Sequence, residues 1–336
     1  NKLYGGTSDL LGDTFADVGI EVTLVDPLDH AAWAAAIRET TRAVLLESVG
    51  NPVLTIPDLP VIADIAHAAG VPVVVDNTMG TPILHRPLEH GADIVVHSAT
   101  KYLGGHGTAI AGVLVDGGTF DFTAQPQRWP RLTRPYHRFG DLVFTEAFDG
   151  TGGRTPFLVL ARAKIVHDLG PTLAASSAAQ ILTGIETLDL RLRKISTDAT
   201  ALAGRLAAAG EVAEVHHPSL PGRPDRHLVA RDFPRGTSGV FSIDLHGGED
   251  AAAAFCDALE LWSLAVNLGD ARSLVCHPAS TTHSHLTPAQ REACGVSEGT
   301  VRLSVGLEDL EDLWADLSRG LEAARAVLPE TRAVTA

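Results

Sequence analysis

Short apolar runs rich in β-branched residues alternate with segments of helical periodicity through the first hundred residues of the chain. The apolar runs are residues 20–25, 43–47, 71–76 and 94–97, and the helical segments are residues 31–38 and 59–69. Residues 71–75 read VPVVV and are apolar on both faces, as in a parallel strand that helices cover on each side. The pattern predicts a doubly wound α/β layer around a mainly parallel sheet.

The middle of the chain shows two further patterns. Residues 126–157 are rich in Pro, Arg, Gly and aromatic residues and lack periodicity, which predicts a long surface connection. Residues 161–209 are mostly helical in pattern, with breaks expected at Gly170, Pro171 and Gly184. We expect a long helix from this stretch to bridge two domains.

The last part of the chain mixes both periodicities. Strand patterns at residues 239–245 and 300–305 alternate with helical patterns at residues 250–261 and 310–326. They predict a smaller α+β domain. We therefore expect a large domain over residues 1–195 and a small C-terminal domain over residues 196–336.

Composition narrows the classes of function. The chain has 336 residues with 41 Asp and Glu against 26 Lys and Arg, a net charge of −15 that disfavours nucleic acid and anionic membranes as partners. No stretch approaches the ~20 apolar residues of a membrane span. Three widely spaced cysteines without CxxC spacing favour a reducing cytoplasm. Because the chain opens at Asn1 and its only methionine is Met79, we expect a processed, truncated or partly resolved chain.

Lysine is scarce in this sequence, and one lysine stands at a predicted strand end. Lys101 follows the strand over residues 94–97, and Asp76 ends the strand over residues 71–75. Both should emerge at the carboxyl edge of the sheet, where α/β folds bind ligands. Such a lysine can form a Schiff base with pyridoxal phosphate (PLP) while the aspartate pairs with the ring nitrogen, although a structural ion pair explains the spacing as well. The hydroxyls of Ser98 and Thr100 suit a phosphate or, equally, a turn.

Six motifs in order then carry a resemblance to a known family. They are LYGGT at 3–7, ESVGNP at 47–52, VDNT at 75–78, HSATKY at 97–102, HPASTTH at 277–283 and VRLSVGLE at 301–308. Together they resemble the Cys/Met-metabolism class of PLP enzymes over nearly the whole chain. The resemblance implies a PLP-dependent transferase of fold type I.

The resemblance also implies a role for each matching residue. The cofactor set comprises Lys101 as the Schiff-base lysine and catalytic base, Asp76 at the ring nitrogen, Ser98 and Thr100 at the phosphate, Tyr4 as a catalytic residue over the ring, and Asn51. The substrate set comprises Arg302 as the clamp for the α-carboxylate, Asn51 and Asn267. Arginine suits this clamp because its planar fork meets a carboxylate with two parallel hydrogen bonds.

Within the class, four features are similar to the O-acetylhomoserine sulfhydrylase branch. These are Gly6, PYH at 135–137, FTEAF at 144–148 and NLGD at 267–270, whereas SDLL at 8–11 and RFG at 138–140 depart from the branch pattern. The implied reaction is γ-replacement on O-acetyl-L-homoserine with sulfide or a thiol, giving homocysteine or methionine. The alternatives are a γ-lyase of the methionine or cystathionine type, an O-succinylhomoserine sulfhydrylase or cystathionine γ-synthase, and a non-catalytic subunit.

The family also implies an assembly. Its members place an N-terminal arm before the first of these motifs, where it contacts the phosphate and reaches a neighbouring subunit, and we expect that arm to be absent from this sequence. The resemblance predicts a homo-oligomer, either a dimer or a dimer of dimers (a homotetramer), that serves methionine biosynthesis in the cytoplasm.

Two groups of histidines do not change this interpretation. His277, His283 and His285 lie near Cys276 but lack metal-ligand spacing, so we expect no metal. His216, His217 and His227 fall in a Pro- and Arg-rich stretch and are expected to be solvated surface residues. The sequence also lacks GxGxxG, HExxH and GxSxG motifs.

Overall fold

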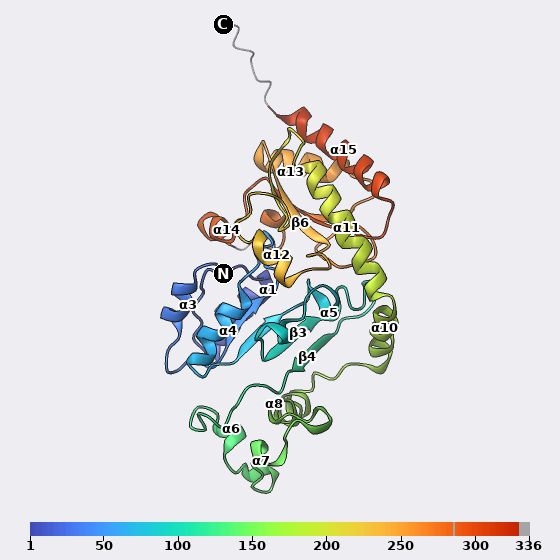
Figure 1. Cartoon of the computed structure of the whole chain (residues 1–336). Helices are drawn as coiled ribbons and strands as arrows, with labels where there is room; N and C mark the ends of the chain where they lie inside the picture. Colours follow the sequence, from blue (N-terminus) through green and yellow to red (C-terminus); the bar gives the residue numbers. More distant parts are fainter. Residues whose placement is uncertain (285, 329–336) are drawn as a thin grey trace.

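The computed structural model describes residues 1–284 and 286–328, and two separate sheets organise them (Figure 1). The first sheet has the order β1 (Val44–Glu47), β2 (Val73–Asp76), β3 (Ile94–Ser98) and β4 (Gly112–Asp116). β1, β2 and β3 run parallel, and β4 pairs with β3 in the antiparallel sense. The predicted parallel sheet is therefore confirmed for the first three strands.

Helix α4 (Leu59–Ala68) shows how this sheet is covered. Its apolar positions recur at helical spacing, and Leu59, Ile62, Ala63 and Ala66 are buried. They share one core cluster with the apolar side chains of β1 and β2, so the connection between these parallel strands packs against them. The other α-helices before β3 are α1 (Gly5–Asp9), α2 (Phe15–Asp17), α3 (His30–Ala36) and α5 (Thr81–Leu84).

The strand predicted over residues 20–25 is wrong. The segment is not part of a strand, and Ile20 and Leu24 are 47% and 59% exposed. The physical reason is pairing: β propensity becomes a strand only where a neighbour completes the hydrogen-bond ladder, and no described strand lies beside this segment.

The connection predicted over residues 126–157 forms a small lobe with its own aromatic cluster at the bottom of Figure 1. Phe122, Leu132 and Phe144 are buried at its centre. Its helices are α6 (Pro130–Thr133), α7 (Phe144–Ala147) and α8 (Pro156–Ala161).

Helices α9 (His167–Leu169), α10 (Ala175–Glu186) and α11 (Leu188–Leu206) follow the lobe. Gly170 ends α9 with φ 76°, which confirms the break predicted there. The break predicted at Gly184 is wrong, because α10 runs through it. A Cβ on Gly184 would lie 2.2 Å from the carbonyl oxygen of Gly104, so this glycine permits a close backbone approach.

Helix α11 leads from the first sheet to the second and buries Leu192, Ile195 and Leu202 completely. The predicted domain boundary at 195/196 falls inside this helix and stays a prediction. The second sheet has the order β5-β6-β9-β8-β7, with β5 (Val212–His216), β6 (Val240–Leu245), β7 (Ser263–Leu264), β8 (Leu274–Cys276) and β9 (Thr300–Ser304). Helices α12 (Arg226–Asp232), α13 (Gly248–Ala258), α14 (Pro288–Cys294) and α15 (Leu310–Val327) complete this part.

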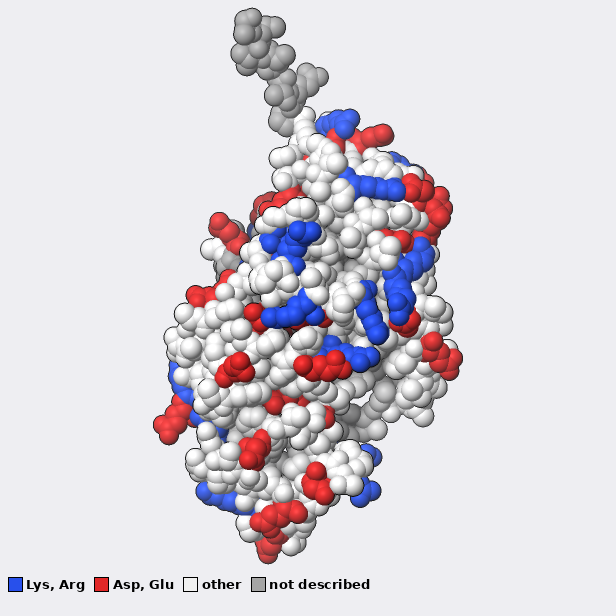
Figure 2. Space-filling view, viewed as in Figure 1, with Lys and Arg blue, Asp and Glu red and all other residues white. Residues whose placement is uncertain are grey.

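The surface carries charges of both signs. Figure 2 shows acidic and basic side chains interspersed over the viewed face. Within residues 1–284 and 286–328, no helix is both long and apolar enough to cross a membrane.

Candidate functional site

The carboxyl ends of the first three strands bring acidic and hydroxyl side chains to one edge of the first sheet. Glu47 ends β1 and lies opposite Asp76 at the end of β2. Asp76 Oδ1 accepts a hydrogen bond from the Thr78 amide at 2.9 Å, and Thr78 Oγ1 accepts one from the Ser98 amide at 2.8 Å. The turn after β2 therefore links Asp76 to the end of β3, as the strand order predicts.

Glu47 is a functional candidate that the sequence reasoning quoted only as part of a motif. Its Oε1 accepts a hydrogen bond from the Tyr4 amide at 2.6 Å, and the residue is buried. Burial, with the charge of Asp76 second, raises the pKa of the Glu47 carboxyl well above its ordinary value of 4.5. The sequence could have indicated Glu47 by its position, because Glu47 ends β1 as Asp76 ends β2.

Lys101 lies in the turn that follows β3, and its Nζ donates a hydrogen bond to Asn267 Oδ1. Burial, with the positive charge of Arg302 second, lowers the pKa of the Lys101 amine. A lowered pKa increases the neutral fraction of the amine. Only that form can act as a nucleophile or accept a proton.

Arg302 interrupts the apolar strand β9 and is 3% exposed. Its guanidinium donates to Asn51 Oδ1 at 3.4 Å and to the Asn267 carbonyl at 3.1 Å. Both partners are neutral, and within the described residues no carboxylate forms an ion pair with it. A buried guanidinium held by amide oxygens is suited to an incoming carboxylate. The structure thus brings Lys101, Asn267, Arg302 and Asn51 into one cluster.

Tyr4 lies at the start of α1 and is 49% exposed, so it is not a core aromatic residue. A Cβ on Gly6 would lie 2.7 Å from the Tyr4 ring, so glycine at this position permits the ring to lie where it does. The hydrogen bond from the Tyr4 amide to Glu47 holds Tyr4 at the carboxyl edge of the first sheet. Its exposed ring is placed where it can cover a ligand bound at that edge.

The two predicted phosphate ligands differ in their surroundings. Thr100 Oγ1 accepts a hydrogen bond from the Ala111 amide at 3.0 Å and donates to the Ala111 carbonyl at 3.3 Å, so this hydroxyl stabilises a turn. Ser98 has its backbone fixed by Thr78 at the end of β3. Both phosphate roles stay predictions, and the turn-forming alternative is the arrangement observed for Thr100.

Sequence comparison decides the family. The sequence profile described as Cys/Met metabolism PLP-dependent enzyme matches residues 1–322. The chain belongs to this family. A curated member, the O-acetyl-L-homoserine sulfhydrylase of Leptospira meyeri, is 42% identical over 327 residues, which cover 96% of this chain and 74% of the relative.

Solved structures agree with the family assignment. A Campylobacter jejuni protein described as an O-acetylhomoserine (thiol)-lyase superposes with a TM-score of 0.90 at 34% identity, covering 95% of this chain and 75% of that chain. That structure holds N'-pyridoxyl-lysine-5'-monophosphate. The cystathionine γ-lyase of Lactobacillus plantarum, complexed with L-serine, superposes with a TM-score of 0.79 at 31% identity, covering 96% of this chain and 74% of that chain. These matches confirm the prediction of a fold type I PLP enzyme.

The residues of this Cys/Met-metabolism enzyme fit PLP chemically. Lys101 offers an amine of lowered pKa, and Asp76 offers a carboxyl group at the end of β2, opposite Glu47. The first group suits the aldehyde carbon of PLP and the second suits its ring nitrogen. Arg302 fits the carboxylate of an amino-acid substrate. The individual roles of these residues in the family member described here remain proposals.

The histidines of the second sheet need a correction. His216 and His217 were expected to be solvated, but they are buried, and only His227 of the three is exposed. His216 is the last residue of β5 and His217 follows it directly. Their place at the end of a strand within the second sheet, rather than in a surface loop, explains why both side chains are buried. Burial lowers the pKa of His217 to about 4.

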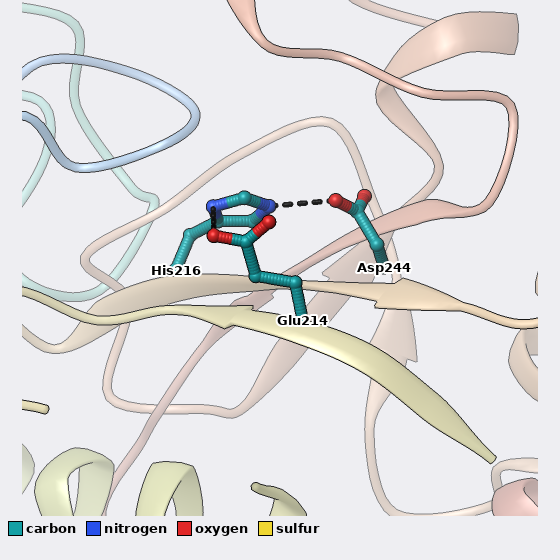
Figure 3. Close-up of side chains that lie close together, drawn as sticks. All are labelled: Glu214, His216 and Asp244. Carbon is teal, nitrogen blue, oxygen red and sulfur yellow. Dashed lines mark hydrogen bonds and ion pairs between the residues drawn. The ribbon is translucent and has the colours of Figure 1, made fainter. Parts of the chain in front are cut away.

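Figure 3 shows that the His216 ring lies between two carboxylates. Its Nε2 lies 2.7 Å from Asp244 Oδ2, and its Nδ1 lies 3.6 Å from Glu214 Oε1. Each carboxylate faces a different ring nitrogen, and the contact with Asp244 connects β5 to β6. One potential ligand atom from each of the three side chains lies within 4.8 Å of the other two, which is close enough for a metal site. We assign no metal to this cluster.

The histidines near Cys276 have partners within the protein. His277 uses Nδ1 with the Ser280 hydroxyl at 2.8 Å and Nε2 with the Glu298 carbonyl at 2.9 Å. The His283 ring contacts the Thr282 hydroxyl at 2.8 Å. His285 lies outside the described residues. The expectation that this group holds no metal stays a prediction.

Proposed function

We propose that this enzyme replaces the acetate of O-acetyl-L-homoserine by the sulfur of sulfide or a thiol, giving homocysteine or methionine. The observation that carries the proposal is the cluster of the Lys101 amine, whose pKa is lowered, with the buried guanidinium of Arg302, both hydrogen-bonded to Asn267. This arrangement supports a reaction at the α-carbon of a carboxylate-bearing substrate. The identity to a sulfhydrylase and the higher TM-score to the thiol-lyase than to the γ-lyase support replacement.

Each residue has a defined task in this proposal. When bound, PLP withdraws electrons from the substrate's α-carbon. Lys101 accepts the Cα proton on Nζ, which the lowered pKa of the amine favours. Asp76 would hold the protonated ring nitrogen, and Tyr4 would cover the ring and assist in moving protons. Ser98 and Thr100 would lie on the phosphate side.

Substrate binding falls to the second sheet. Arg302 would bind the α-carboxylate with two parallel hydrogen bonds, while Asn51 and Asn267 fix its guanidinium. Loss of a second proton, from Cβ, accompanies departure of acetate from Cγ. The sulfur nucleophile then bonds to Cγ and the protons return, so that one acetate leaves for each sulfur added.

The cellular setting is also a proposal. We place the enzyme in the cytoplasm, in methionine biosynthesis, as a homo-oligomer that is a dimer or a dimer of dimers. Three free cysteines support a reducing compartment. Sedimentation velocity tests the assembly, and a monomer at all concentrations would contradict it.

One assay separates replacement from its alternatives. The purified protein, supplied with PLP, is given O-acetyl-L-homoserine with and without sulfide, and homocysteine, acetate and α-keto acid are measured. We expect homocysteine and acetate in equal amounts, and only when sulfide is present. Keto acid and ammonia formed equally well without sulfide would instead indicate a γ-lyase. Preference for O-succinyl-L-homoserine would move the assignment to that ester, and binding of PLP without turnover of any ester would support a non-catalytic subunit.

A further inference from the structure

A buried arginine outside the candidate site lies against the turn that carries Lys101. Arg191 belongs to helix α11 and is 4% exposed. Its Nη2 donates a hydrogen bond to the Gly184 carbonyl at 2.7 Å, and its Nε donates one to Thr187 Oγ1 at 3.1 Å. The junction of α10 and α11 therefore fixes the orientation of this guanidinium.

The remaining nitrogen of the Arg191 guanidinium is buried without a partner. Within residues 1–284 and 286–328, no atom accepts a hydrogen bond from Nη1. No carboxylate of the described chain forms an ion pair with Arg191, and burial lowers the pKa of its guanidinium. A buried cation without an acid costs free energy, so an apolar side chain of similar length would fill the same space more favourably. The charged fork of Arg191 therefore indicates a role besides packing.

The nitrogen without a partner faces the glycine turn that follows Lys101. A Cβ on Gly105 would meet Arg191 Nη1 first and would lie 2.6 Å from Arg191 Cζ, so only a residue without a side chain permits this approach. Gly105 also has a φ of 71°, which glycine adopts without strain. The Gly105 amide donates to the Lys101 carbonyl at 2.7 Å. The turn that Arg191 contacts is therefore bonded to the backbone of Lys101 itself.

The same turn is bonded on its other side to the loop that carries Asn267. The Gly105 carbonyl accepts a hydrogen bond from the Ala271 amide at 2.8 Å. The Lys101 amine donates to the side chain of Asn267 in that loop. Gly105 thus connects the backbone of Lys101 with the loop that binds its amine. A displacement of Gly105 would disturb both ends of the contact between Lys101 and Asn267.

We propose that Arg191 is a positioning residue for Lys101. Its guanidinium, fixed by α10 and α11, keeps Gly105 in place, and Gly105 keeps the Lys101 amine within reach of Asn267. Arg191 acts through this turn and transfers no proton itself. The inference rests on the proposed function only where turnover is measured.

Arg191→Met tests this role, because methionine fills part of the space but donates no hydrogen bond. In the holoenzyme we expect kcat with O-acetyl-L-homoserine and sulfide to fall by about 10- to 100-fold, the effect of a slightly misplaced reacting group. KM should change by less than about 3-fold, because Arg302 lies in β9 and is not bonded to the turn. Arg191→Lys should recover part of kcat, since an ammonium can still donate to the Gly184 carbonyl.

Arg193→Met is the matched control. Arg193 lies in the same helix, but it is exposed and pairs with Asp189 at 2.8 Å. This variant should keep full kcat. Equal kinetics of the two methionine variants would overturn the proposal. Arg191→Lys carries the same comparison if Arg191→Met does not fold.

Hydrogen exchange gives a readout without turnover. In Arg191→Met the amides of Gly105 and Ala271 should exchange about 10-fold faster, the effect of losing roughly one hydrogen bond of local stability. Amides of β6 and β9 should keep their protection. A general loss of protection with full kcat in the folded enzyme would mean that Arg191 only stabilises the fold, and would overturn the proposal.

A double-mutant cycle tests the contact between Arg191 and Gly105 directly. Gly105→Ala places a methyl group against the guanidinium and should lower kcat in the enzyme that has Arg191. In Arg191→Met the same methyl group should cost less, whereas the strain of alanine at this φ is equal in both backgrounds. We expect the effects on kcat to depart from additivity by about 3-fold or more. Additive effects would contradict the contact.

Failure of the proposed function would be recognised separately. An unmodified enzyme that does not convert O-acetyl-L-homoserine would refute the assigned reaction, while the exchange of the Gly105 and Ala271 amides would still test the positioning role. Unchanged exchange of both amides in Arg191→Met would overturn that role whatever the reaction is.

Discussion

The two sheets of this enzyme differ in how completely other parts of the chain cover their strands. In the second sheet β9 is buried along its whole length between β6 and β8, and α13 and α15 pack together over it. In the first sheet, four of the five residues of β4 are exposed, and β1 borders a cavity. The central strand of the second sheet is therefore covered by helices of this chain, whereas the two edge strands of the first sheet border solvent or a cavity. The comparison teaches that the sheet that positions Lys101 and Asp76 is less completely covered, within the described residues, than the sheet that contains Arg302.

The two regions also divide the candidate chemistry. The first sheet presents Lys101 and Asp76 at its carboxyl edge, where PLP would be held. The second sheet presents Arg302 and Asn267, which would bind the substrate. Replacing residues from one region should therefore affect the chemical step, and replacing residues from the other should affect substrate affinity.

The largest effect is expected in the first region. Lys101→Ala should reduce kcat by about 10²- to 10⁴-fold or more, because it removes the group that exchanges the Cα proton. Borohydride reduction followed by peptide mapping should label Lys101 in the unmodified enzyme. Lys164→Ala, at a surface ion pair with Asp168, is the matched control and should keep full activity. A labelled lysine elsewhere would contradict the assignment.

Two substitutions, one in the core beside the second sheet and one on an edge strand of the first, compare how much buried packing contributes to stability in each region. Phe255→Ala removes a fully buried ring under α15 and should lower the free energy of unfolding by about 3–5 kcal/mol. Val115→Ala, on exposed β4, should change it by no more than about 0.5 kcal/mol. Chemical denaturation with urea gives both values. Similar losses at the two sites would show that the first sheet is as well covered as the second.

Arg302 tests the division between chemistry and substrate binding. Arg302→Ala should raise KM for O-acetyl-L-homoserine by an amount equal to about 2–5 kcal/mol, with a smaller change in kcat. Arg302→Lys should recover only part of this loss, because an ammonium cannot offer a planar fork. Arg272→Ala is the control, since Arg272 is exposed and pairs with Asp270. A variant that lost kcat at constant KM would place Arg302 in the chemical step instead.

The two regions should respond to pH with opposite signs. His217 has its pKa lowered to about 4, so the unfolded state binds its proton more readily and stability falls as pH drops from about 6.5 toward 4. Glu47 has its pKa raised, so the folded state keeps the proton and stability falls as pH rises above about 4.5, at up to ~1.4 kcal/mol per pH unit until the raised pKa is reached.

Isosteric variants separate the two contributions. His217→Gln should flatten the acid limb of the stability profile, and Glu47→Gln should flatten the alkaline limb. Unfolding free energies measured from pH 4 to 9 give both limbs. An unchanged alkaline limb in Glu47→Gln would show that its carboxyl is not held neutral in the fold.

The sequence predicted the positions of the main site residues better than it predicted their hydrogen-bond partners. The apolar runs predicted the strand end at Asp76 and the place of Lys101 just after a strand. Arg302 stood out because it interrupts an apolar strand that the structure confirms. Glu47 was missed as a separate group because its burial and its bond to the Tyr4 amide arise from residues 43 positions apart. The turn contact of Thr100 with Ala111 could not be inferred from hydroxyl spacing.

By itself the sequence determined the helices and strands whose periodicity is strong, the family, and the cofactor, because these depend on local spacing and on motifs in order. Tertiary structure alone decided the state of residues 20–25, the burial of His216 and His217, and the continuity of α10 through Gly184. Each of these depends on what packs opposite the segment. A strand forms only where a neighbouring strand pairs with it, and a side chain is buried only where other parts of the chain cover it. Whether a helix continues through a glycine depends on the backbone that packs against that glycine.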